Sequence, residues 1–155
     1  MKTLTTLLAL ALACTALPVS AATDYAPLTQ AVDNFFTALD AITRKLPSAN
    51  SAADTAAMVD SWSQANETLA AAGEDFAAKH PEVYKTPEPP PEFAATYARI
   101  GRMRTDYLPL QTGLGALLKR FIDDPAVKVA LQRFQKSAVR IQHLGNPPPN
   151  PPPAP

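Results

Sequence analysis

The chain has 155 residues, the usual size of one domain, and carries 14 basic and 14 acidic side chains. Its single cysteine, Cys14, excludes a disulfide within the chain. Most of its 17 prolines lie within residues 81–91 and 147–155. These two stretches therefore read as a connection and a tail rather than as parts of a core.

The first 22 residues are expected to form a signal peptide. Lys2 is followed by an apolar run over residues 4–17 and by the small residues of positions 19–22. This run is shorter than the roughly 20 residues that cross a bilayer, and small residues are typical before a cleavage site. We predict cleavage after residue 21 or 22, which gives a periplasmic or secreted protein with no transmembrane segment.

A lipid anchor on Cys14 is the alternative, because lipoprotein signals place a cysteine directly after a box of small residues. Such boxes usually have leucine three positions before the cysteine, where this chain has Ala11. Export without a lipid is therefore the prediction. The mature chain then has no cysteine, and its stability must come from its core alone.

Apolar residues recur three or four positions apart in four segments, the pattern of a helix with one buried side. The first two segments contain Leu28, Val32, Phe35, Leu39, Ile42 and Leu46, then Met58, Trp62, Ala65, Leu69, Ala72 and Phe76. The third contains Phe93, Thr96, Ile100, Met103, Tyr107, Leu110, Leu114, Leu117 and Phe121, and the fourth Val127, Leu131, Phe134, Ala138 and Ile141. We predict an all-α fold, an up-and-down antiparallel four-helix bundle over residues 23–146.

Capping residues predict where several of the helices begin or end. Ser51 with Asp54 is expected to cap the second helix. Asp124 followed by Pro125 is expected to start the fourth, since proline suits the first helical position. Gly145 is expected to end it.

Three proline-containing stretches interrupt the helical pattern. The connection between helices 2 and 3, from residue 80 to residue 91, should be extended and stiff. Pro109 should kink or break the third helix, because it lacks an amide donor and crowds the preceding turn. Residues 147–155 are predicted to be a disordered, proline-rich tail of polyproline II type.

The two halves of the mature chain carry opposite charge. Residues 23–80 contain eight acidic and three basic side chains, whereas residues 92–146 contain nine basic and four acidic ones. The simplest interpretation is internal complementarity, with an acidic first hairpin packed beside a basic second one.

No residue pattern typical of an enzyme is found in the sequence. General acid–base chemistry needs carboxylates or a histidine gathered in a pocket. Here the acids Asp33, Asp40, Asp60 and Glu67 lie off the apolar stripes and are expected on a solvated face. A glycine-rich phosphate loop, Cys-x-x-Cys-His and inward Glu-x-x-His pairs are absent. We therefore expect no enzyme, no catalytic, cofactor-binding or metal-binding residues, and no cofactor.

In its arrangement the chain resembles the periplasmic haem-b four-helix-bundle cytochromes. The resemblance lies in the mature start at Asp24, the proline-containing connection Pro81–Pro91, and His143 at the end of the last helix. It implies a haem or small-ligand carrier that uses the bundle interior, which is the alternative function. The methionine ligand of that family, at the start of helix 1, has no counterpart between residues 23 and 46. Met103 is a substitute that antiparallel helices would bring level with His143.

The last helix carries a basic row formed by Arg133, Lys136, Arg140 and His143, whose spacing of 3, 4 and 3 places them on one face. Such a row can contact a phosphate-rich or carboxylate-rich surface, or can pair with acids of the first two helices. Aromatic residues do not alternate with it, so specific nucleic-acid recognition is not expected. We predict a non-enzymatic binding or structural module of the cell envelope. Its partner would be an anionic envelope component or a protein, in contact with this row.

Overall fold

The computed structural model describes residues 24–80 and 90–144, and the regular elements in these two ranges are all helices, which confirms the all-α prediction. They are α1 (Ala26–Lys45), the short 3-10 helix η1 (Leu46–Ser48), α2 (Ala52–Lys79), α3 (Pro91–Asp106), α4 (Leu108–Phe121) and α5 (Pro125–Leu144). The expected signal peptide with Cys14, most of the proline-rich connection, Gly145 and the tail lie outside the described residues. Among the described helices, none combines the length and the apolar content of a membrane span.

Two helix starts use the predicted caps. The Ser51 hydroxyl accepts a hydrogen bond from the Asp54 amide at 3.1 Å and donates one to the Asp54 carboxylate at 2.7 Å. This bond to the hydroxyl lowers the pKa of Asp54. At the start of α5 the Asp124 carboxylate accepts from the Ala126 amide at 2.8 Å, and Pro125 is the first helical residue. Both caps are confirmed.

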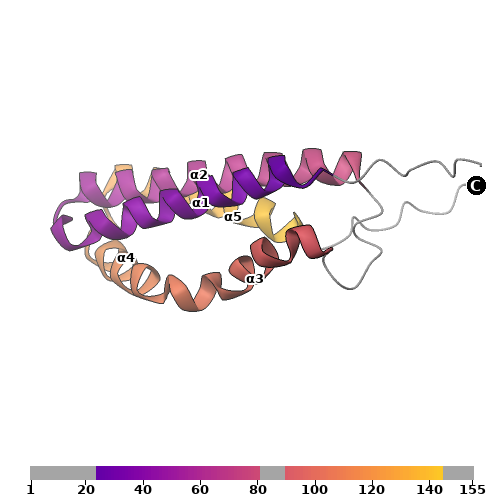
Figure 1. The fold of residues 1–155 in the computed structure, drawn as a ribbon. Coiled ribbons are helices and arrows are strands. Elements are labelled where there is room, and N and C mark those ends of the chain that lie inside the picture. The colour runs from indigo at the N-terminus through magenta and orange to yellow at the C-terminus, as the bar shows by residue number, and fades with distance from the viewer. Residues whose placement is uncertain (1–23, 81–89, 145–155) are drawn as a thin grey trace, which may run out of the picture.

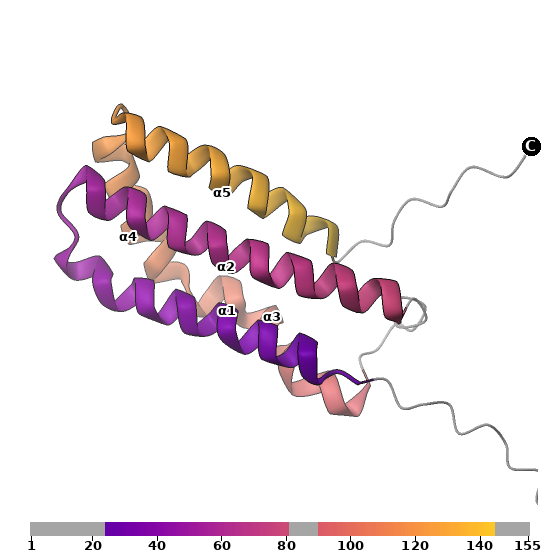
Figure 2. The same cartoon turned by 90° about the horizontal axis from the view of Figure 1, so that it is seen from above.

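The three longest helices lie side by side with α2 in the middle, as Figure 2 shows. The chain direction of α1 is opposite to that of α2, whereas α2 and α5 run the same way (Figure 2). One face of this layer is crossed by α3 and α4, which follow a single bent path that bows outward near its middle (Figure 1). The other face of the layer, called here the outer face, is not covered by any described helix.

An apolar core lies between the layer and α4. Its buried members are Val32, Phe35, Phe36, Leu39, Ile42, Ala56, Met58, Val59, Trp62, Leu110, Leu114, Val127 and Ala130. Trp62 is 9% exposed and meets the Phe134 ring edge-on, with centroids 5.3 Å apart. Its place on an apolar stripe thus predicted a core residue correctly. A smaller aromatic cluster of Tyr25, Phe76 and Phe93 lies where α1 begins and α2 ends.

The most extensive contact among the described elements joins α2 and α5, and small side chains make part of it. Ser63, Asn66 and Ala70 of α2 and Ser137 of α5 are buried there. The Asn66 amide donates to the Ser137 hydroxyl at 3.1 Å, and that hydroxyl donates to the carbonyl oxygen of Phe134 at 2.9 Å. Small side chains allow two helix axes to approach closely. Because α2 is buried on this side as well as on its apolar stripe, it is the central helix.

The third predicted helix is divided into α3 and α4 at Tyr107, two residues before Pro109. Tyr107 has φ −106° and ψ 18°, which is outside the helical range. Pro109 lies in the first turn of α4, where an amide donor is not needed. The break expected from Pro109 is therefore present.

One residue of the stripe predicted for α3 is not buried, whereas Phe93 is buried and Met103 packs against the core. Ile100, placed on the buried stripe from its spacing, is 39% exposed. The neighbouring Arg99 faces α1 instead: its guanidinium lies 4.1 Å from the centroid of the Phe36 ring and pairs with Asp33 at 2.7 Å. The assignment of Ile100 was wrong: next to it Arg99, not Ile100, makes the contacts with α1, and the spacing of apolar residues does not predict contacts of an arginine.

Candidate functional site

The basic row of α5 faces acids of α2. Arg133 pairs with Asp60 at 3.2 Å. Arg140 donates from Nε to Glu74 at 2.7 Å and from Nη1 to Glu67. These bonds raise the pKa of Arg140, and its guanidinium lowers the pKa of Glu74. Two of the predicted contact residues are thus already paired within the molecule.

Lys136 differs from its neighbours in the row. Its side chain is exposed, and in the described part of the chain it has no ion-pair partner. It lies between Arg133 and Arg140 on one side of α5. The side chain of His143 lies outside the described residues. The described row is therefore one unpaired lysine between two paired arginines.

Acids of α1 are also bound by the second half of the chain. Asp33 pairs with Arg99, and Asp40 accepts a hydrogen bond from the Tyr107 hydroxyl at 2.6 Å. Burial, and then this bond, raise the pKa of Tyr107 to about 12. The sequence placed these acids on a solvated face. They are exposed, but each also has a partner in the second half of the chain, which corrects that expectation. Internal complementarity between the two halves describes them better.

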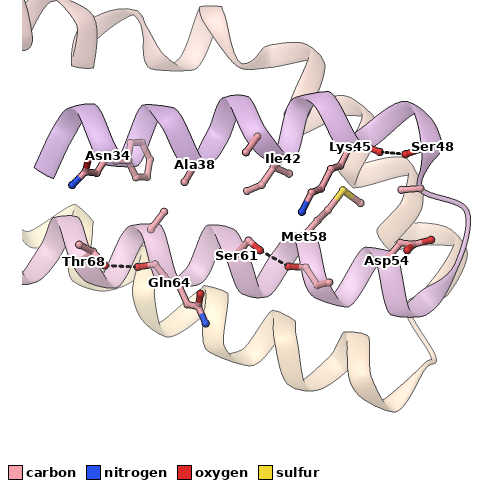
Figure 3. A pocket seen from close by; sticks show the side chains of 15 residues that line it. Asn34, Ala38, Ile42, Lys45, Ser48, Asp54, Met58, Ser61, Gln64 and Thr68 are labelled. Atoms are coloured by element: carbon pink, nitrogen blue, oxygen red, sulfur yellow. Dashed lines mark hydrogen bonds between the residues drawn. The ribbon is translucent and has the colours of Figure 1, made fainter. Parts of the chain in front are cut away.

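A groove of about 660 Å³ runs between α1 and α2. Figure 3 shows Ala38, Ile42 and Lys45 of α1 and Met58 of α2 extending into the space between the two helices. On α1 these residues lie on the side away from Asp33, the residue that α3 contacts. The groove therefore opens on the outer face.

Small side chains line the walls of this groove, and charged ones are confined to one end. The small residues are Ala38, Ala41, Ala49, Ala57, Ser61 and Ala65. Buried Ile42 and Met58 give it an apolar floor. Lys45 and Asp54 lie at the end next to the turn between α1 and α2 (Figure 3). Over most of its length the groove thus offers apolar and uncharged contacts.

A second groove, of about 540 Å³, lies between α2 and α5. Its lining residues are Ser63, Gln64, Glu67, Thr68, Arg133 and Lys136. Gln64 and Thr68 also line the first groove, so they form a ridge of α2 between the two. The outer face therefore combines a groove that is uncharged over most of its length with a charged one.

Of the two candidate haem ligands, Met103 and His143, the structure describes the side chain of Met103 alone. Met103 is partly buried and packs against the apolar core, a common place for a flexible methionine. Within residues 24–80 and 90–144, no group of three His, Cys, Asp or Glu side chains is arranged to hold a metal ion.

No known protein family, curated protein or solved structure matches this chain. The α1–α2 groove was not found by sequence reasoning, which followed large apolar residues. The sequence pattern that indicates this groove is a run of small or uncharged residues on the solvent side of α2, at Ala57, Ser61, Gln64 and Thr68. Their spacing of 4, 3 and 4 places them along one side of a helix.

Proposed function

We propose that this chain is an exported, non-enzymatic helical module of the cell envelope that binds another protein across its outer face. One observation carries this proposal: apart from Lys45 and Asp54 at one end, the side chains that line the α1–α2 groove are uncharged, and small ones such as Ala57 and Ser61 are exposed to solvent. A helix face that only meets water usually carries charged and long polar side chains. A face of alanine and serine is instead suited to close contact with another backbone.

The partner segment that fits this groove best is a helix. Small side chains allow helix axes to pack about 8–10 Å apart. An amphipathic helix laid in a groove between two helices is a recurrent mode of recognition. The apolar floor at Ile42 and Met58 would receive its apolar side chains, and Lys45 and Asp54 would fix which end lies at the turn.

The charged groove beside it is proposed as the part of the contact that selects the partner. Lys136 supplies an unpaired cation, and Arg133 is exposed while bound to Asp60. Charges at the rim of an interface mainly affect specificity and association rate. The predicted contact row of Arg133, Lys136 and Arg140 is thus retained in a narrower role, next to an uncharged groove.

The proposal also includes the bundle architecture. We treat α3 and α4 as one bent helix, because only Tyr107 separates them. With that pair counted once, α1, α2, α3–α4 and α5 are the four members of an up-and-down bundle. The uncovered outer face is then the side on which a partner can add a further helix.

Site-specific photo-crosslinking in cells that express the protein tests this function. A photoreactive residue at Ser61, inside the α1–α2 groove, is expected to give a discrete adduct with a second protein. The same residue at Gln132, exposed on α5 and outside both grooves, is the matched control and should not give that adduct. Equal labelling at both positions, or no adduct at Ser61, would argue against a docking groove.

A further inference from the structure

The α3–α4 arm, residues 91–121, carries large apolar side chains on its surface. Tyr97 is 56% exposed, Ile100 39% and Leu108 57%. In the described chain six large apolar residues are exposed, and these three are half of them. Tyr97 and Ile100 lie three positions apart and therefore share one side of α3, and Leu108 is the first residue of α4. These three exposed residues are called here the apolar row.

The contacts that hold α3 in place leave this row free. Towards α1 the helix uses the Arg99–Asp33 ion pair, the cation–π contact of Arg99 with Phe36, and the bond from Tyr107 to Asp40. Tyr97 and Ile100 belong to neither of the apolar clusters of the described chain. Within the described residues, these side chains therefore add to neither apolar cluster.

The arm is also basic. Residues 91–121 contain five basic and two acidic side chains. One of the acids, Asp106, lies 3.8 Å from Arg102 in an ion pair. Lys119 and Arg120 are exposed in the last turn of α4, and neither has an ion pair with another described residue. Apolar exposure and excess positive charge therefore occur on the same segment.

We propose that the α3–α4 arm rests on an anionic lipid surface. An interfacial helix inserts apolar and aromatic side chains at the level of the headgroups, and its basic residues attract anionic lipids. The arm bows away from the other helices (Figure 1), so its middle would be the first part to touch a flat membrane. Leu108 lies next to this bend. The arm lies on the face opposite the two grooves, so a molecule held this way leaves its outer face accessible.

Vesicle co-sedimentation of the mature full-length chain tests this proposal. The probes are vesicles of phosphatidylethanolamine with one third phosphatidylglycerol, and vesicles of phosphatidylcholine alone. We expect binding to the anionic vesicles, falling steeply as salt is raised, and little binding to the neutral ones. The variant Tyr97→Ser/Leu108→Ser should bind the anionic vesicles about tenfold more weakly or worse, because it loses two large apolar contacts.

The control variant is Val129→Ser/Val139→Ser, which removes two exposed apolar side chains from α5, 45% and 53% exposed. It should bind like the parent chain. Both double variants change surface residues, and their circular dichroism should match that of the parent. Absence of binding to the anionic vesicles, or the same loss in both variants, would overturn the proposal. A concentration-dependent dimer that only the arm variant loses, without vesicle binding, would assign the row to contact between two copies and would also overturn it.

Discussion

Replacement of Ser137 by alanine probes the contact between α2 and α5. The Ser137 hydroxyl is fully buried and accepts hydrogen bonds from Asn66 at 3.1 Å and from Ser63 at 3.3 Å. Alanine leaves the Asn66 amide, itself 4% exposed, without this acceptor in a buried interface. An orphaned buried donor costs about 1–3 kcal/mol, so the free energy of unfolding should fall by about that amount.

Chemical denaturation of the variant and its controls measures this effect. Ser61→Ala removes an exposed hydroxyl that donates to the carbonyl oxygen of Ala57 within its own helix, and it should change stability by about 0.5 kcal/mol or less. In the double variant Asn66→Ala/Ser137→Ala the donor and its acceptor are both gone. Its loss should be smaller than the sum of the two single losses by about 0.5 kcal/mol or more. If Ser137→Ala lowered the free energy of unfolding no more than Ser61→Ala does, the assignment of a buried polar contact between α2 and α5 would be contradicted.

Five further outcomes follow from the structure. Trp62→Ala should lower the free energy of unfolding by about 3–5 kcal/mol, and a loss below about 1 kcal/mol in denaturation would contradict its burial. Gly115→Ala should raise the melting temperature, since helix propensity improves by about 1 kcal/mol and the new methyl group meets nothing within 4 Å. Alanine at Gly113 should raise the melting temperature less, because a side chain of η1 lies 2.5 Å from the added carbon and must move. In a pH titration of stability, the Tyr107 contact should be intact below pH 10. It should weaken between pH 10 and about 12, where the unfolded state releases its proton first. An absorbance scan of the purified mature protein should show no Soret band, since Met103 packs in the core; a band would favour the haem carrier instead.

The sequence predicted the helices and several of their ends because those depend on local chemistry. Spacing of large apolar residues located the buried stripe of α1 and placed Trp62 in the core. The caps at Ser51 and Asp124 need only a side chain and an amide two or three residues away. Pro109 likewise acts on its own turn, which is why the break before α4 was expected.

What the sequence did not reveal depends on contacts between distant segments. Ser63 and Ser137 are 74 positions apart, and small polar residues do not stand out in an apolar pattern, so the second buried side of α2 was missed. The contact of Arg99 with Asp33, beside the exposed Ile100, joins residues 66 positions apart, and the spacing of apolar residues cannot predict it. Pairing of the basic row with acids of the first two helices was one of two alternatives in the sequence, and the choice between them depends on how α2 and α5 pack.

Blocking the α1–α2 groove while crosslinking from within it is the most direct measurement of the proposed function. A photoreactive residue at Ser61 is combined either with Ala57→Phe, which fills the groove wall, or with Ala53→Phe, exposed on α2 and outside the groove. We expect the partner adduct to disappear with Ala57→Phe and to persist with Ala53→Phe. An adduct of equal yield in both variants would show that the partner does not occupy the groove.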